Sequence, residues 1–124
     1  MFEISVQDHF DAAHFLKGYQ GKCAQIHGHT WQVEIKVRGE NLDEIGMILD
    51  FSVIKKALKQ ILHPLDHGLI NDLAIFRETN PTAENISRYI FQEMSQALKD
   101  VPVQVYRVTV WESPGAAAAY FKEE

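Results

Sequence analysis

The sequence predicts an α+β fold in which an antiparallel sheet is covered on one face by two helices. Alternating apolar and polar residues, typical of strands, occur at 2–14, 27–37 and 103–112. Two stretches with helical spacing of apolar residues, 52–62 and 81–98, lie between them. This order, with no repeat or linker, predicts a single domain spanning 1–124.

Composition narrows the class of protein. The net charge of −5 argues against a nucleic-acid partner or a membrane surface, which would require a basic patch. The single cysteine, Cys23, excludes an internal disulfide and fits a reducing cytosol. With no long apolar run or leader-like start, we expect a cytoplasmic protein.

The first strand places one histidine on its buried face. Phe2, Ile4, Val6 and Phe10 share that face, and continued alternation adds His14. His9 falls on the outer face by the same count. A bulge within 11–13 would reverse this choice.

The second strand begins with His27-Gly28-His29. The two imidazoles project from one face, about 6–7 Å apart at the backbone. Trp31 and three aliphatic residues continue that face, so it is the buried one. Buried imidazoles are costly unless they are satisfied, and a metal ion would satisfy both.

The loop at 17–22 would return the chain so that His14 lies beside His27 and His29. Three histidines with an open position are typical of a catalytic zinc site. Cys23 remains open to three readings: a fourth zinc ligand, a reactive thiol, or a small buried side chain.

Residues 46–49 are predicted to form a short extended segment, and residues typical of a helix start follow it. Asp50 or Ser52 caps the first helix, which ends before Pro64. Asn80 is the expected cap of the second helix, with Pro81 in its first turn. The apolar stripes are Ile54, Leu58, Ile61 and Leu62 in the first helix, and Ile86, Ile90, Met94, Ala97 and Leu98 in the second.

Three further polar residues could carry chemistry. Asp66 and His67 are adjacent in a loop, where a carboxylate can orient an imidazole. Glu112 ends the strand at 103–112 on its apolar face, where a guanidine-like edge of a heterocycle would suit it. A phase shift near Val105 predicts a bulge in this strand, and 118–121 predicts a short last strand.

Together these residues resemble the 6-pyruvoyl-tetrahydropterin synthase family, and within it the 6-carboxy-5,6,7,8-tetrahydropterin synthases of queuosine biosynthesis. The resemblance runs nearly end to end. Each motif is weak alone, but the ordered set is specific. The motifs are Phe10-Asp11-Ala12-Ala13-His14, Cys23 with three residues before His27-Gly28-His29, Gly46-Met47-Ile48-Leu49-Asp50-Phe51, Leu65-Asp66-His67, Pro81-Thr82-Ala83-Glu84-Asn85 and Trp111-Glu112-Ser113.

The resemblance implies a tunnelling fold, with a four-stranded antiparallel sheet and two helices. It implies a homo-oligomer, commonly a hexamer formed as a dimer of trimers, with active sites at subunit interfaces. The zinc ligands would be His14, His27 and His29. Proton transfer would fall to Cys23, Asp66 and His67, and Glu112 would anchor the pterin ring.

The implied reaction is that of a zinc-dependent lyase. It converts 7,8-dihydroneopterin triphosphate to 6-carboxy-5,6,7,8-tetrahydropterin, with release of acetaldehyde and triphosphate. The short spacing from Cys23 to His27 favours this carboxy branch, whereas Ser113 stands where the family usually has threonine. The alternatives are the pyruvoyl-forming reaction and a non-catalytic zinc protein with Cys23 as fourth ligand.

Overall fold

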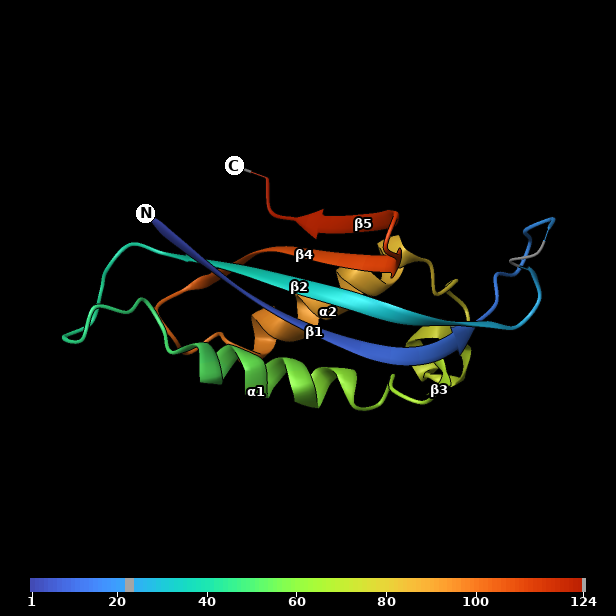
Figure 1. Cartoon of the computed structure of the whole chain (residues 1–124), viewed down its shortest axis with the longest axis horizontal. Helices are drawn as coiled ribbons and strands as arrows, with labels where there is room; N and C mark the ends of the chain where they lie inside the picture. The colour runs from blue at the N-terminus through green and yellow to red at the C-terminus, as the bar shows by residue number, and fades with distance from the viewer. Residues whose placement is uncertain (22–23, 124) are drawn as a thin grey trace.

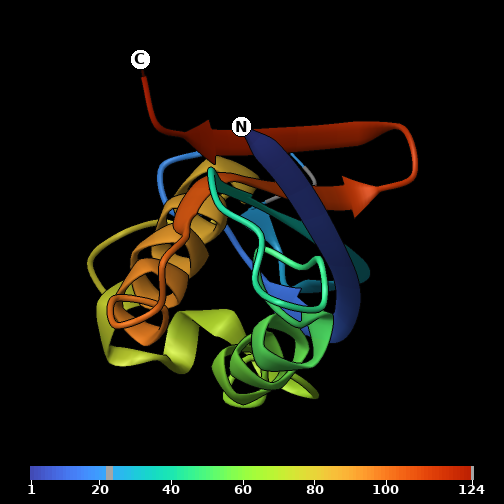
Figure 2. The same ribbon diagram turned by 90° about the vertical axis from the view of Figure 1, so that its left-hand side faces the viewer.

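A computed structural model describes residues 1–21 and 24–123. In this part of the chain a five-stranded sheet has the order β3-β1-β2-β4-β5, and helices α1 and α2 lie on one of its faces (Figures 1 and 2). The predicted α+β class with two helices on one face is confirmed.

β1 (Phe2–His14) and β2 (His27–Gly39) form the antiparallel pair at the centre of the fold. Their register runs from Phe2 opposite Gly39 to His14 opposite His27, without a bulge. The predicted alternation therefore persists to the end of β1. His14 lies on the buried face, with 1% of its surface exposed.

α1 (Phe51–Leu62) begins at the predicted cap. The Asp50 side chain accepts a hydrogen bond from the Ser52 N–H at 2.8 Å, so Asp50, and not Ser52, is the N-cap. The helix ends at His63, immediately before Pro64, as predicted. The expected extended piece at 46–49 is wrong, because this segment is bent and has no strand pairing.

α2 (Ala83–Ala97) begins later than predicted. Thr82 is the N-cap, and its hydroxyl accepts a hydrogen bond from the Asn85 N–H at 3.1 Å. Asn80 does not cap the helix, because its side chain is bonded to the backbone of Lys17. The helix still buries Ile86, Ile90 and Met94, as its stripe predicted.

β4 (Gln104–Ser113) pairs with β2, and β5 (Ala116–Phe121) pairs with β4. Lys36 pairs with Arg107 and Val37 with Val105, so Tyr106 is the extra residue of the predicted bulge. The last strand is confirmed and slightly longer than expected.

The expected count of four antiparallel strands needs one correction. A fifth strand, β3 (Gly68–Leu69), pairs in parallel with Ala12 and Ala13 of β1. Two 3₁₀ turns, Ile70–Asp72 and Ala74–Phe76, connect it to α2. A two-residue strand has no periodicity that a sequence could reveal. Within the described residues, no helix is long and apolar enough to cross a membrane.

Candidate metal centre and active site

The predicted histidines meet where β1 ends and β2 begins. Potential ligand atoms of His14, His27, His29 and Glu112 all lie within 4.8 Å of one another. The Nε2 atoms of His14 and His27, which are direct partners across the two strands, are 3.0 Å apart. Strand register thus brings together side chains that are distant in the sequence.

Backbone carbonyls fix which ring nitrogens face this group. His14 Nδ1–H donates to the carbonyl of Pro81, and His27 Nδ1–H donates to the carbonyl of Gln25, both at 2.8 Å. A neutral imidazole carries one proton, so both Nε2 atoms present lone pairs. Two lone pairs 3.0 Å apart repel unless a cation lies between them.

Burial keeps two of these imidazoles in the form that binds metal. Desolvation by burial lowers the pKa of His14 and outweighs its hydrogen bond to Pro81, which acts in the opposite direction. Burial also lowers the pKa of His29, against the opposing charge of Glu112. Both rings therefore favour the neutral state, which is the ligand state of histidine.

Glu112 of β4 closes the group. Its Oε1 lies 3.0 Å from His29 Nε2 and 4.0 Å from His14 Nε2. Despite the short contact, His29 Nε2 is shielded from solvent and has no hydrogen-bond partner of suitable geometry. Sequence reasoning placed Glu112 on the inward face, but did not anticipate its position beside His29.

These atoms fit a zinc ion. Two nitrogens bound to one tetrahedral zinc at about 2.0–2.1 Å lie roughly 3.3 Å apart, close to the separation found here. The buried, unpartnered Nε2 of His29 would gain a partner. His27 and His14 already donate their Nδ1–H groups to carbonyls, the usual outer contact of a metal-bound histidine.

Trp31 supports the group from the core side. Its ring is fully buried and meets the rings of His14 and His29 edge to face, with centroids 4.9 and 5.3 Å away. Its indole N–H donates to the carbonyl of Ala12 at 3.2 Å. The sequence placed Trp31 on this face, and the structure adds that it limits how the two imidazoles can turn.

Asp66 and His67 are not part of the metal group. They form a second group with Asp11 at the edge of β1. Asp66 Oδ2 lies 2.9 Å from His67 Nδ1, as the orienting role requires. The backbone N–H of Asp11 donates to Asp66 Oδ1 and lowers the pKa of that carboxyl, and the His67 contact acts in the same direction.

His67 has a backbone φ of 58°, which side-chain-bearing residues rarely adopt. Its N–H donates to the carbonyl of Asp11 at 2.6 Å, which ties this conformation to β1. Strained backbone that surrounding bonds hold in place is frequent at functional sites. Nothing in the sequence signalled this conformation.

A pocket of about 520 Å³ lies between the two groups. His29 lines it from the metal group, and His67 from the edge group. Its remaining walls are small: Asp11, Ala12, Ala13, Gly28, Thr30 and Gly68. The Thr30 hydroxyl donates to Asp11 Oδ1 at 2.5 Å. Cys23, the third predicted proton-transfer residue, lies outside the described residues.

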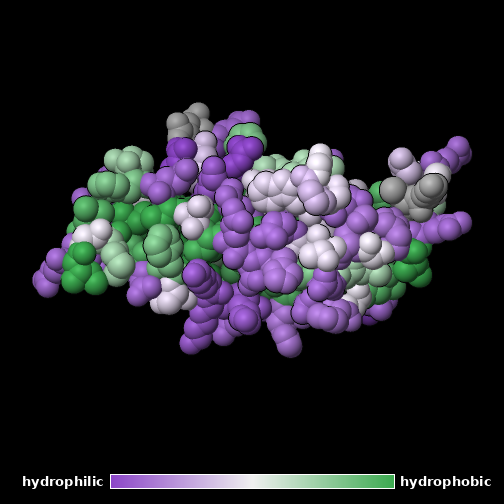
Figure 3. All heavy atoms as spheres, in the orientation of Figure 1, coloured by the Kyte–Doolittle hydropathy of each residue, from purple (hydrophilic) through white to green (hydrophobic). Residues whose placement is uncertain are grey.

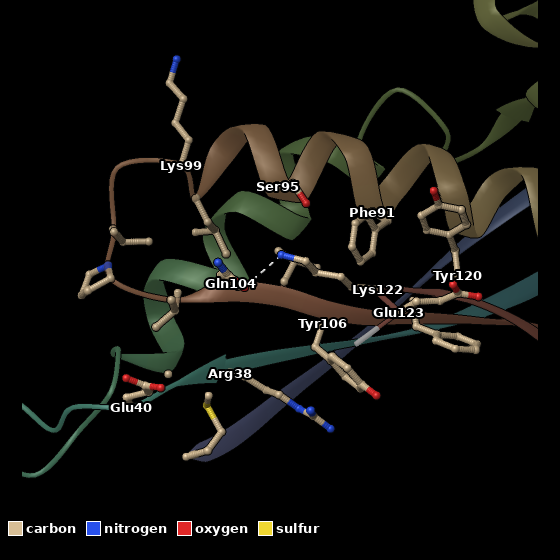
Figure 4. Close-up of a pocket in the computed structure, with 18 of the residues that line it drawn as sticks. Arg38, Glu40, Phe91, Ser95, Lys99, Gln104, Tyr106, Tyr120, Lys122 and Glu123 are labelled. Carbon is tan, nitrogen blue, oxygen red and sulfur yellow. Dashed lines mark hydrogen bonds between the residues drawn. The ribbon is translucent and has the colours of Figure 1, made fainter.

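A larger cavity of about 1310 Å³ lies elsewhere, between the C-terminal half of α2 and strands β4 and β5 (Figure 4). Phe91, Tyr106 and Tyr120 line it together with Lys99 and Lys122, and Lys122 Nζ donates to Gln104 Oε1. It includes none of the residues in the two groups above. Size alone therefore does not identify the site.

The geometry defines a small α+β domain in which a histidine-rich group that could hold a metal ion lies beside an oriented carboxylate–imidazole pair. Residues 3–123 match the family model described as 6-pyruvoyl tetrahydropterin synthase. The chain therefore belongs to this family.

Curated relatives and a solved structure agree with this assignment. The chain is 33% identical to the 6-carboxy-5,6,7,8-tetrahydropterin synthase of Haemophilus influenzae, over 97% of this chain and 99% of the relative. It is 36% identical to the enzyme of the same name from Synechocystis, over 98% and 94%. The structure of Caenorhabditis elegans 6-pyruvoyl tetrahydropterin synthase superposes with a TM-score of 0.88 at 28% identity, over 98% and 96%. The prediction of an enzyme of this lyase type is confirmed, and so is the tunnelling fold.

Proposed function

We propose that this protein is a zinc-dependent lyase that converts 7,8-dihydroneopterin triphosphate to 6-carboxy-5,6,7,8-tetrahydropterin, releasing acetaldehyde and triphosphate, in cytoplasmic queuosine biosynthesis. The observation that carries the proposal is the convergence of potential ligand atoms of His14, His27 and His29, in which the Nε2 lone pairs of His14 and His27 face each other. The names of the curated relatives favour the carboxy branch.

His14, His27 and His29 would hold the zinc ion. When bound there, zinc supplies Lewis-acid polarisation of the substrate's side-chain oxygens. The neutral rings need no deprotonation before they bind, because burial lowers the pKa of His14 and His29. Trp31 restricts the rotation of two of the rings and so limits the geometries that this site can adopt.

Proton transfer would fall to Cys23 and His67. Asp66 holds His67 through Nδ1, which leaves Nε2 to exchange a proton with the substrate. Asp66 keeps its negative charge because hydrogen bonds lower its pKa, so it stabilises the imidazolium that forms. Cys23 would act as a thiolate, helped by a nearby cation.

Glu112 has two competing roles. As an anchor, its carboxylate would accept hydrogen bonds from the guanidine-like edge of the pterin ring. As a ligand, it would complete a four-coordinate site, which its position 3.0 Å from His29 Nε2 also allows. We favour the anchor, because a catalytic zinc needs an open position for substrate.

We also propose a homo-oligomer, a hexamer formed by two trimers, with sites between subunits. Two features support assembly. β5 is an edge strand whose six residues carry no charge, and unprotected edges tend to pair. Apolar side chains gather at the left-hand end of the face in Figure 3, and exposed Met1, Phe2, Leu42 and Ile45 belong to the segments at that end (Figure 1).

The deciding experiment incubates zinc-loaded protein with 7,8-dihydroneopterin triphosphate. Acetaldehyde release is followed together with the mass of the pterin product. Acetaldehyde with a carboxy-pterin supports the proposal. A pyruvoyl product keeps the site and changes the reaction, an alternative favoured by the likeness to the Caenorhabditis elegans structure. Tight zinc binding without turnover leaves a non-catalytic zinc protein, with Cys23 as the candidate fourth ligand.

A further inference from the structure

One connection, residues 66–80, covers the edge of β1 that faces away from β2. The Asp11 N–H donates to Asp66 Oδ1 at 2.9 Å, and the His67 N–H donates to the Asp11 carbonyl. Next along the edge, β3 pairs in parallel with Ala12 and Ala13. The connection thus follows β1 in the same direction as the chain approaches His14.

Beyond His14, two asparagine side chains make the backbone hydrogen bonds that a neighbouring strand would otherwise make. The Phe15 N–H donates to Asn71 Oδ1, and Asn71 Nδ2 donates to the Phe15 carbonyl, both at 3.0 Å. The Lys17 N–H donates to Asn80 Oδ1 at 2.8 Å, and Asn80 Nδ2 donates to the Lys17 carbonyl at 2.9 Å. Each amide supplies the acceptor and the donor that a paired strand would supply.

These bonds lead directly to the metal group. Phe15 follows His14, and Pro81 follows Asn80. The Pro81 carbonyl accepts from His14 Nδ1, so the position of that carbonyl sets the direction of His14 Nε2. The Asn80 carbonyl in turn accepts from Asn85 Nδ2 at 2.9 Å, in the first turn of α2.

We propose that Asn71 and Asn80 are positioning residues of the metal centre, acting as amide clamps that orient His14. Asn80 holds the Pro81 carbonyl at a fixed distance from β1, and Asn71 holds the end of β1 itself. The inference rests on the proposed metal centre and concerns residues to which that proposal gives no role. Neither Asn71 nor Asn80 belongs to the metal group or lines the pocket between the two groups.

Asparagine chemistry makes the clamp testable. Aspartate has the same shape but no N–H donor, so Asn80→Asp sets a carboxylate oxygen against the Lys17 carbonyl and loses one of the two bonds. Asn80→Ala loses both. Because Asn80 is only half-buried, we expect both of its variants to retain the fold. They decide the question if the more buried Asn71→Asp does not fold.

The experiment measures zinc dissociation constants of full-length protein by chelator competition. Cobalt(II) absorption reports ligand geometry, and urea unfolding of the metal-free protein reports stability. We expect Asn80→Asp and Asn80→Ala to weaken zinc binding about 10- to 100-fold and to change the cobalt spectrum. Asn41→Asp makes the same chemical change at an exposed loop position and should leave both unchanged.

Ile90→Val removes a methyl group from the buried face of α2 and serves as the stability control. If the Asn80 variants bind zinc as tightly as Ile90→Val and the wild type, the clamps only hold the fold together and the inference is wrong. If the wild type itself does not bind zinc, the metal centre fails instead, so the two failures are distinguishable.

Discussion

His14 is the most constrained ring of the site. It is almost fully buried, its Nδ1 is bonded to Pro81, and Trp31 meets its ring edge to face. A protonated ring at this position would be poorly solvated, so the folded state disfavours protonation of His14 more than the unfolded chain does. This difference links the stability of the metal-free protein to pH.

We predict that the metal-free protein loses stability as pH falls below about 6.5, the ordinary histidine pKa. Burial lowers the pKa of His14 and His29 in the folded state. The unfolded chain therefore binds protons first, and the free energy of unfolding decreases until pH reaches the lowered folded pKa. Urea unfolding between pH 8 and pH 5.5, in the presence of a chelator, measures how steeply the free energy of unfolding changes with pH.

His14→Gln is the matched variant, because it keeps a polar side chain that does not titrate. Its slope over the same pH range should be shallower than that of the wild type. Equal slopes would mean that His14 does not contribute to the pH dependence.

Substitutions at Cys23 and Glu112 can separate an effect on catalysis from an effect on metal binding. We predict that Cys23→Ala abolishes turnover while zinc remains bound, because the thiol moves a proton and does not hold the metal. Zinc content and acetaldehyde release are measured on the same sample. Loss of zinc with the thiol would make Cys23 a ligand.

For Glu112→Gln we predict unchanged zinc affinity with a large loss of kcat/KM, because the amide has one acceptor oxygen where the carboxylate offers two to the pterin edge. Glu112→Asp, which keeps the charge on a shorter side chain, should retain more activity. Weaker zinc binding in Glu112→Gln would instead assign the carboxylate to the metal, as its contact with His29 allows.

At the scale of elements, periodicity predicted the parts that bury apolar faces. Strict alternation along β1 was sufficient to choose His14 over His9, because no bulge interrupts its pairing with β2. The stripe of α2 and the bulge at Tyr106 followed from the same kind of pattern. Most of the sheet and the histidine face of the site were therefore predictable.

The segment at 66–82 was less predictable, because contacts distant in sequence determine it. Asparagine is a residue type that often caps helices, but the Asn80 side chain is hydrogen-bonded to the backbone of Lys17. Thr82 is therefore the N-cap. The positive φ of His67 and the strand β3 depend likewise on the edge of β1. The position of Glu112 beside His29 depends on the register of β4, which a single sequence does not give.

The corrected cap gives an element-scale prediction. Thr82→Ala should lower the free energy of unfolding by about 1 kcal/mol, because the Asn85 N–H loses its hydrogen-bond acceptor. Urea unfolding of metal-free protein measures the change. Thr82→Ser keeps the hydroxyl and should lie close to the wild type; equal losses in both variants would attribute the effect to the methyl group.

At the scale of the whole molecule, the arrangement of the two groups bears on assembly. The metal group and the Asp66–His67 pair share no residue, and the pair lies in the turn before β3, outside the strands that carry the metal group. His29 and His67 line one pocket within a single chain, an arrangement in which both groups of one copy would face the same substrate. A site shared between copies is the alternative that a ring of subunits would create.

Mixing two inactive variants distinguishes these arrangements. His27→Ala should lose zinc binding, and His67→Ala should lose proton transfer, so neither is active alone. If one subunit supplies the zinc ligands and its neighbour supplies His67, an equal mixture unfolded and refolded together forms intact sites at about a quarter of the interfaces. We therefore predict about a quarter of wild-type activity in the mixture. Refolding each variant separately before mixing is the control and should give none. An inactive co-refolded mixture of normal oligomer size would place both groups of a working site in the same chain, and pocket-lining His29 and His67 would then act together within each subunit.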